Sequence, residues 1–337
     1  MSVITGTNWN AYDAATMTAR EIYGRTLAEL GKHKDKIVAL TADLENTTAI
    51  VHFGKAFPER FFNVGIAEQN MLGIAAGMAK AGLIPFASTM AVFACLRAGE
   101  QLRTDIAYQN LPVKIIATHA GISFGHAGTT HHCTEDFAVT RSIANMTVIC
   151  PADGIETSKA VQACLDTPGP VYIRIGRGFE PPCDESDDYV YEIGKAITMR
   201  EGTDLTIICC GIAVLQSINA AKTLAENDGL SVRVINMHTI KPIDREAILA
   251  AVTDTRRILT VEEHNVEGGL GDAVASVIAG SGKGCVFKKH GIQDTFSTIG
   301  YAEDLYAHYG LDANGIVDKV REIMGLEFEA DENWDDE

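Results

Sequence analysis

The feature that most constrains this fold is the alternation of short β-branched runs with longer helical patterns. In the first half of the chain, strand-like runs recur at 36–43, 61–64, 83–88, 113–119, 147–150 and 171–176. Helical patterns lie between most of them, around 67–81, 91–109, 134–143 and 154–166. Strands separated by helices of this length indicate βαβ units, whose strands run parallel. We therefore expect an α/β fold built on doubly wound parallel sheets.

The segment TAREIYGRTLAEL predicts the first helix. Thr18 and Glu21 have the spacing of a capping box at its start. Gly31 follows the last leucine of the pattern, and glycine is the usual residue just past a helix end. We expect the helix to end there.

A second α/β set follows a change of composition near residue 185. The stretch FEPPCDESDDY holds two prolines and five acidic residues, which is typical of a linker. The runs DLTIICCG, VRVINM and RILTVEEH then alternate with helical patterns. We predict a first domain over 1–180, a linker over 181–189, a second domain over 190–326 and an acidic tail over 327–337.

Charge and cysteine usage exclude some classes of partner. The formal net charge of −17 argues against a nucleic acid or an anionic membrane surface as the main partner. The eight cysteines form no CxxC pair, and the start MSVITGTNWN does not resemble a signal peptide. No apolar run is long enough to span a bilayer. These features predict a cytoplasmic protein with no membrane segment.

Polar residues collect where the predicted strands of the first domain end. In parallel α/β sheets, ligands bind in the crevice beyond the carboxyl ends of the strands. The residues that follow these strands in turn are Asp43, Glu68, Ser88, Thr89, His119 and Arg177. A Gly-rich loop after His119 adds His126, His131 and His132. One edge of the sheet should therefore combine acids, bases and a cation suited to phosphate.

Simpler roles stay open for these residues. Asp43 is as compatible with a helix N-cap as with a site. Glu68 opens a helix-like segment, where a carboxylate favours the helix dipole. Arg177 is compatible with a surface charge, although the glycines beside it permit close approach by a ligand. The segment EGGLGDA resembles a loop at a helix N-terminus that can hold an anion, and we interpret it as structural.

A metal site is the main rival interpretation of the histidine loop. The stretch GHAGTTHHC offers four potential ligands, His126, His131, His132 and Cys133. Their spacing matches no established zinc pattern, so we predict no metal ligands in this chain.

Several segments together resemble a known family. FFNVGIAEQNMLGIAAGMAKAGLIPFAST, THAGISFGHAGTTHH, PADGIET and IRIGRG resemble the carboxyl-terminal half of transketolase, and most closely the separate small subunit of split transketolases. The likeness extends from about residue 15 to 325. It implies a pyrimidine-binding domain, a transketolase carboxyl-terminal domain and thiamine diphosphate as cofactor. The implied reaction is transfer of a two-carbon ketol unit from a ketose, expected to be phosphorylated, to an aldose.

The resemblance implies catalytic roles for three residues. Glu68 matches a glutamate that hydrogen-bonds N1′ of the cofactor's aminopyrimidine. A carboxyl group shielded from water can share a proton with that nitrogen, which favours the tautomer that removes the C2 proton. His119 and His131 match histidines that contact the C1 hydroxyl and the carbonyl of the sugar donor.

The same resemblance implies two groups of binding residues. Those near the cofactor pyrimidine are Asp43, Met90, Phe93 and Leu96. Those in contact with substrate are Arg20, Thr47, His119, His126, His131 and Arg177. Arg20, Thr47 and Arg177 match the phosphate site, and the guanidinium fork suits a phosphate group.

This chain also departs from the family pattern. Aromatic residues are usual at Met90 and frequent at Leu96, and serine is usual at Thr47. More consequentially, Ala127 replaces an aspartate that reads the configuration of the donor's C2 hydroxyl. Because alanine cannot make that contact, we expect a sugar other than the ordinary donor, with His126 offering a replacement polar contact.

A missing motif implies a partner. The family binds the diphosphate and Mg²⁺ (or Ca²⁺) through a G-D-G…N motif in its amino-terminal half, and this sequence lacks it. The resemblance thus implies an amino-terminal transketolase subunit that carries that site, an α2β2 assembly, and no activity of this chain alone. Alternatives are the beta subunit of a deoxyxylulose-phosphate synthase-like or 2-oxoacid dehydrogenase E1-like enzyme, or a non-catalytic paralogue.

Overall fold

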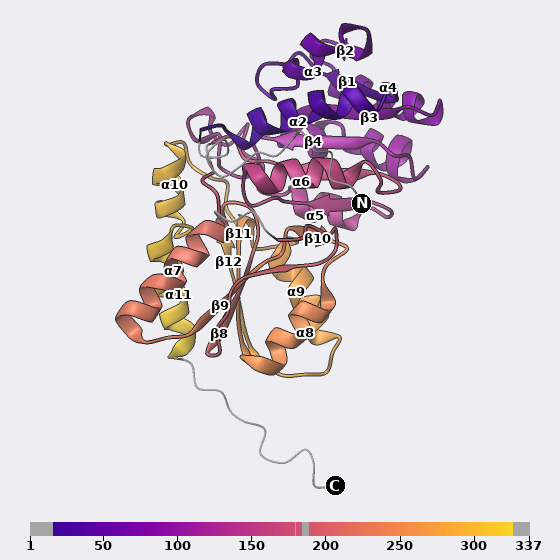
Figure 1. Cartoon of the computed structure of the whole chain (residues 1–337). Coiled ribbons are helices and arrows are strands. Elements are labelled where there is room, and N and C mark those ends of the chain that lie inside the picture. The colour runs from indigo at the N-terminus through magenta and orange to yellow at the C-terminus, as the bar shows by residue number, and fades with distance from the viewer. Residues whose placement is uncertain (1–15, 179, 184–188, 326–337) are drawn as a thin grey trace.

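The computed structural model describes residues 16–178, 180–183 and 189–325. Two α/β units lie one above the other, the first from indigo to magenta and the second from orange to yellow (Figure 1). Each is built around its own sheet, with helices on both faces. The predicted α/β class is confirmed.

The first sheet has the strand order β10-β5-β6-β4-β3-β1-β2. Its parallel strands are β1 (Ile37–Thr41), β2 (Phe61–Asn63), β3 (Ile84–Met90), β4 (Lys114–Thr118), β5 (Thr147–Ile149) and β6 (Val171–Arg174). All five residues of β1 and of β4 are buried. This burial explains why the central strands appear in the sequence as continuous apolar runs.

One strand of the first sheet comes from the second half of the chain. β10 (Thr239–Lys241) pairs antiparallel with β5 at the sheet edge. The sequence pattern gives no sign of this strand, because it is three residues long and its pairing is remote. The two units are therefore joined by a shared sheet as well as by the connecting segment.

Helices cover both faces of the first sheet. On one face, α2 (Ala19–His33), α3 (Val51–Ala56) and α6 (Gly154–Cys164) pack around residues such as Tyr23 and Ile116. On the other, α4 (Glu68–Lys80) and α5 (Asp136–Ser142) pack around residues such as Leu72 and Ile115.

The segment predicted as a helix over 91–109 is wound as two π-helices, η2 (Phe93–Arg97) and η3 (Gln101–Ala107). Two short 3₁₀ turns complete the unit, η1 (Pro58–Arg60) and η4 (Gly125–Ala127).

The predicted start of α2 is confirmed and its predicted end is wrong. The Thr18 side chain accepts a hydrogen bond from Glu21 N at 3.3 Å, as a cap should. The helix continues through Gly31 to His33. A Cβ at position 31 would lie 2.5 Å from the Phe57 ring, so this glycine permits close packing and does not end the helix.

The second sheet has the order β12-β11-β8-β9-β7. Its strands are β7 (Ile197–Arg200), β8 (Leu205–Cys209), β9 (Val232–Asn236), β11 (Arg257–Asn265) and β12 (Val286–Ile292), all parallel except β7. Its helices are α7 (Ala213–Asp228), α8 (Arg245–Asp254), α9 (Leu270–Ala279), α10 (Ala302–His308) and α11 (Ala313–Met324).

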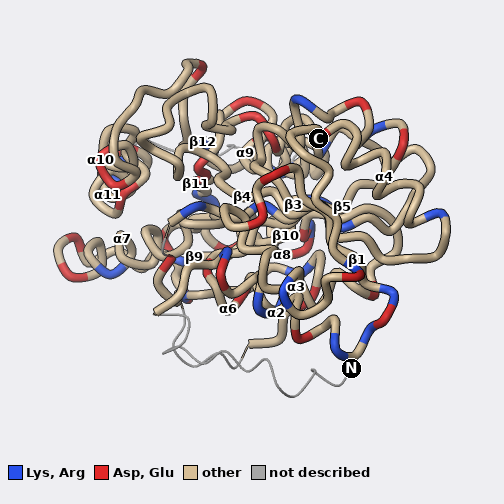
Figure 2. The backbone as a smooth tube through the Cα atoms, turned by 90° about the horizontal axis from the view of Figure 1, so that it is seen from above, with Lys and Arg blue, Asp and Glu red and all other residues tan. Residues whose placement is uncertain are grey.

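In the described part of the chain, no helix is both long and apolar enough to cross a membrane. Basic and acidic residues are interspersed around the periphery (Figure 2).

Candidate active site

Three of the predicted site residues follow neighbouring strands at the same edge of the first sheet, whereas Ser88 and Thr89 lie within β3. β1, β3, β4 and β6 are neighbours in the sheet, so the residues that follow them lie along one edge. Asp43 follows β1, His119 follows β4 and Arg177 follows β6. Asp43 and His119 adopt left-handed backbone conformations, with φ of 62° and 58°. Such strain in residues other than glycine is concentrated at functional sites.

Glu68 is buried, and its partner is an arginine. The side chain is 2% exposed in the first turn of α4, where a carboxylate favours the helix dipole, although it caps no backbone N–H of this helix. Arg97 Nη1 donates a hydrogen bond to Glu68 Oε1 at 3.0 Å. The Arg97 guanidinium carbon also lies 4.0 Å from the centroid of the Phe93 ring. Sequence reasoning missed Arg97, although its position four residues after an expected wall aromatic was a possible signal.

The residues expected to line the cofactor ring differ in how deeply they are buried. Phe93 is half-buried and Met90 is 6% exposed, whereas Leu96 is 50% exposed. Thr89 Oγ1 is buried and has no hydrogen-bond partner among the described residues. A buried carboxylate and an aromatic face, both contacted by Arg97, together fit an aminopyrimidine, which offers both polar nitrogens and a π-face.

Phe124 is the centre of the histidine loop. Three predicted histidines place their rings against it, with centroid distances of 4.8 Å for His119, 5.3 Å for His126 and 5.8 Å for His131. The guanidinium carbon of Arg177 lies 5.1 Å from the same ring. Sequence reasoning missed Phe124, yet a single large aromatic inside a Gly-rich polar loop was a usable signal. The ring thus contacts four of the six predicted substrate residues.

His119 remains neutral at physiological pH. Burial, together with the positive charges of Arg20 and Arg177, lowers its pKa to about 3. Its Nδ1 lies 2.9 Å from Thr118 Oγ1. A neutral imidazole with one nitrogen engaged leaves the other available to a ligand hydroxyl.

Two arginines approach each other at the predicted phosphate site. Arg20 Nε donates to the Arg177 carbonyl at 3.1 Å, and Arg20 Nη1 donates to the Thr47 carbonyl. Burial lowers the pKa of Arg20, and the charge of Arg177 acts in the same direction. Two cations in this arrangement repel each other, and a bound dianion would offset that repulsion.

Asp43 is exposed after β1 and is hydrogen-bonded to Asn63, the last residue of β2. Asn63 Nδ2 donates to Asp43 Oδ1 at 3.4 Å, and Asn63 Oδ1 accepts from the N–H groups of Asp43 and Gly65. The next helix, α3, has Ile50 at its N-cap. The interpretation of Asp43 as a helix N-cap is therefore wrong.

His132 is a structural residue. Its Nδ1 lies 2.6 Å from Ser297 Oγ and its Nε2 lies 3.1 Å from the Gly125 carbonyl, so both ring nitrogens are engaged. Across residues 16–178, 180–183 and 189–325, no group of three His, Cys, Asp or Glu side chains is placed to hold a metal ion.

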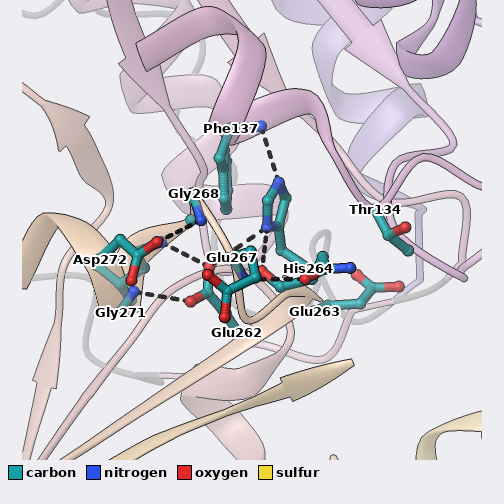
Figure 3. Close-up of polar contacts among 12 residues, drawn as sticks. Thr134, Phe137, Glu262, Glu263, His264, Glu267, Gly268, Gly271 and Asp272 are labelled. Atoms are coloured by element: carbon teal, nitrogen blue, oxygen red, sulfur yellow. Dashed lines mark hydrogen bonds and ion pairs between the residues drawn. The ribbon is translucent and has the colours of Figure 1, made fainter. Parts of the chain in front are cut away.

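The second unit holds the histidine loop in place through the end of β11. Glu263 Oε1 accepts from Ile122 N at 2.8 Å, and Asn265 N donates to the Thr134 carbonyl at 2.8 Å. His264 Nε2 accepts from Phe137 N at 3.1 Å, just beyond the loop (Figure 3). Both ends of the segment from 122 to 134 are thus tied to the second unit.

A buried ion network supports this contact. Arg174 donates from Nε to Asp136 Oδ2 at 3.0 Å and from Nη2 to the Glu263 carbonyl at 2.6 Å. Beside it, Glu262 accepts from the N–H groups of Leu270 and Gly271 at 2.6 and 2.7 Å, at the start of α9 (Figure 3). The anion at this helix N-terminus is therefore the protein's own carboxylate, which confirms the structural interpretation of EGGLGDA.

Comparison with known proteins covers most of the chain. Residues 15–179 match the family described as transketolase, pyrimidine binding domain, and residues 194–316 match transketolase, C-terminal domain. A putative transketolase C-terminal section from Methanocaldococcus jannaschii is 44% identical over 309 residues, covering 91% of this chain and 96% of that protein. A subunit of the apulose-4-phosphate transketolase from Phocaeicola vulgatus is 39% identical over 308 residues, covering 91% and 98%.

A solved structure shows the same arrangement. It is described as a split gene transketolase, inactive β4 tetramer, and it superimposes with a TM-score of 0.83 at 43% identity. The match covers 93% of this chain and 99% of that one.

Proposed function

The chain belongs to the transketolase family, and from this premise we propose that it is the carboxyl-terminal subunit of a split, thiamine-diphosphate-dependent transketolase. It would transfer a two-carbon ketol unit from a phosphorylated ketose to an aldose. The observation that carries the proposal is the buried Glu68 beside Phe93, at the edge where His119, His131 and Arg177 also lie. Burial of a carboxylate is costly, and the partner that Glu68 has, Arg97, is half-exposed, so the carboxylate remains able to bind a ring nitrogen of a ligand.

The residues around Glu68 would hold the pyrimidine part of the cofactor. Glu68 would bind a ring nitrogen and hold a proton at its carboxylate, while Phe93 and Met90 exclude water from that contact. Leu96 and the exposed Asp43 would complete the pyrimidine-binding pocket once the partner subunit is bound. When bound, thiamine diphosphate supplies the nucleophilic carbon and the electron sink that ketol transfer requires.

The histidine cluster would bind the sugar. Neutral His119 is suited to exchanging hydrogen bonds with a hydroxyl, and His131, whose ring also contacts Phe124, would act near the donor carbonyl. Arg20 and Arg177 would clamp the terminal phosphate, with Thr47 beside them. Together these contacts orient the donor while leaving the reacting end toward the cofactor.

Sugar specificity would follow from the change at Ala127. The side chain expected to read the donor's C2 hydroxyl is absent there, and His126 is exposed against Phe124. We propose that His126 supplies the replacement contact and that the natural donor is an uncommon phosphorylated sugar. The relative from Phocaeicola vulgatus, which is named for apulose 4-phosphate, supports a phosphorylated but unusual donor.

A second subunit would complete the enzyme. We propose an amino-terminal transketolase subunit that carries the diphosphate and Mg²⁺ (or Ca²⁺), with an α2β2 assembly and a cytoplasmic location. The similar split-gene protein, described as inactive in a β4 form, supports a requirement for that subunit. Eight described cysteines that are all free are consistent with a reducing compartment.

The test is to isolate the native complex and identify its chains and its bound cofactor. Two different chains, bound thiamine diphosphate, and two-carbon transfer between a ketose phosphate and an aldose would support the proposal. Activity with pyruvate in place of the ketose would favour a synthase-like or dehydrogenase-like enzyme. A complex without the cofactor would favour a non-catalytic paralogue.

A further inference from the structure

Arg97 contacts both Glu68 and the Phe93 ring, and the cofactor's aminopyrimidine would need the same two contacts. Its Nη1 lies 3.0 Å from Glu68 Oε1, and its guanidinium plane lies over the Phe93 ring with 4.0 Å to the centroid. The carboxylate and the aromatic face are the two features that fit this surface to an aminopyrimidine. An arginine side chain and the cofactor ring cannot occupy both features at once.

The environment of Arg97 makes it easy to move. The Glu68 side chain is 2% exposed, whereas the Arg97 side chain is 47% exposed. Its backbone is fixed separately, because Gln69 Nε2 donates to the Arg97 carbonyl at 3.1 Å. The guanidinium can therefore swing into solvent on its flexible stem without any change in the main chain.

We propose that Arg97 is a displaceable counter-ion, which neutralises buried Glu68 in the cofactor-free subunit and leaves when the cofactor's aminopyrimidine takes its place. This inference rests on the proposed function, since it assumes the same cofactor. Its physical basis is that an unpaired buried carboxylate is costly, so the empty subunit needs a substitute partner. Arg97 thus competes with the cofactor for Glu68.

The test is equilibrium binding of thiamine diphosphate with Mg²⁺ to the assembled two-subunit complex, measured by calorimetry. Arg97→Gln should lower the Kd by about five- to tenfold, since binding no longer breaks a half-exposed charged pair. The matched control, Arg321→Gln, removes the same charge from α11, where Arg321 pairs with Asp228, and should leave the Kd unchanged. The wild-type-to-variant Kd ratio should also shrink as salt is raised, because salt screens the pair.

A second measurement needs no cofactor. In the isolated chain, Arg97→Gln should lower the unfolding midpoint by about 2–4 °C, because Glu68 loses its partner. Adding Glu68→Gln should restore most of that loss, as expected for two coupled residues.

The outcomes separate this inference from the proposed function. A complex whose wild-type form binds no thiamine diphosphate would overturn both. Normal wild-type binding with an unchanged or raised Kd in Arg97→Gln would overturn the displacement alone, because Arg97 would then stay beside the bound cofactor and support it. Additive stability effects of the two substitutions would also overturn it.

Discussion

Glu263, at the end of β11 in the second unit, accepts a hydrogen bond from the backbone N–H of Ile122 at the start of the histidine loop, at 2.8 Å. At the other end of the loop, the Thr134 carbonyl accepts from Asn265 N. The second unit carries none of the predicted catalytic side chains, yet it fixes the segment that presents His126 and His131. Its role at the site is to position that loop.

Removal of the Glu263 carboxylate should loosen the loop. We expect Glu263→Ala to lower kcat/KM by about tenfold or more, and to lower the free energy of unfolding by about 1–3 kcal/mol, because Ile122 N and Arg174 lose a buried partner. Steady-state kinetics and urea unfolding of the assembled enzyme would measure both.

Two further variants separate positioning from bulk stability. Glu263→Gln keeps an acceptor oxygen and should recover most of the kinetics. Glu267→Ala removes a nearby exposed carboxylate that pairs with Lys289, and should change neither quantity. Wild-type kinetics in Glu263→Ala, despite reduced stability, would show that the loop keeps its position without this contact.

The central strands could be predicted because they are buried on both faces and leave continuous apolar runs. The edge strand β10 could not, since three residues that pair with a remote partner leave no periodic signal. The end of α2 was predicted wrongly at Gly31, again because the deciding contact is remote in sequence. A glycine that ends a helix and one that admits the Phe57 ring look alike until the neighbour is known.

The place of the candidate site on the sheet could be predicted, and its contacts could not. Strand ends place Asp43, His119 and Arg177 along one edge, and this follows from parallel topology alone. Arg97 meets Glu68 across 29 positions of sequence through a π-wound segment, whose turn differs from the 3.6-residue period that sequence patterns assume. The contacts of Phe124 with three histidines depend on the folded path of its loop, which no periodic pattern in the sequence describes.

Substitution of Glu68 tests the proposed catalytic role directly. Glu68→Gln keeps the size of the side chain and an oxygen that can accept from Arg97, so the chain should fold with an unfolding midpoint close to that of the wild type. Ketol transfer should fall by about 10²-fold or more, because the amide cannot hold the exchanging proton. Glu100→Gln, an exposed neighbour in the η2–η3 segment, is the control. Wild-type turnover by Glu68→Gln would remove Glu68 from the mechanism.

Arg177 should act on the phosphate of the substrate. Arg177→Ala should raise the KM for a phosphorylated ketose by the equivalent of about 1.5–3 kcal/mol, which is the usual contribution of a charged hydrogen bond. The KM for the same ketose without its phosphate should change little, and this pair of substrates separates phosphate binding from damage to the Phe124 cluster. An equal rise for both substrates would contradict the assignment.

Stability should depend on pH through carboxyl groups buried between the two units. Burial raises the pKa of Glu156 to about 8, with the charge of Asp153 acting in the same direction, and burial raises that of Glu180 to about 8. Burial likewise raises the pKa of Glu263 to about 7. Each group takes up a proton on folding between its ordinary value of 4.5 and its folded value. The stability of the folded state therefore falls as pH rises through that window.

Buried histidines oppose this trend only at lower pH. Burial lowers the pKa of His119 to about 3, and those of His238 and His264 to about 4. The stability that these neutral histidines contribute is fully present above pH 6.5, the ordinary pKa of histidine. It is lost as the pH falls from 6.5 toward their lowered pKa values. Between pH 6.5 and 8, only the carboxyl contribution still changes among these groups.

We therefore expect the free energy of unfolding to fall between pH 6.5 and pH 8.5. Urea titrations at constant ionic strength would measure it, and each fully shifted carboxyl group contributes up to about 1.4 kcal/mol per pH unit. Glu156→Gln removes one such group and should make the fall in stability with pH smaller. The variant should be less stable at every pH, because Asn236 Nδ2 loses one of its two acceptor oxygens. Glu246→Gln, which removes an exposed carboxylate paired with Lys195, should leave the slope unchanged. A flat profile in the wild type would mean that these carboxyl groups are ionised in the folded chain and that the interface between the units is more hydrated than the structure indicates.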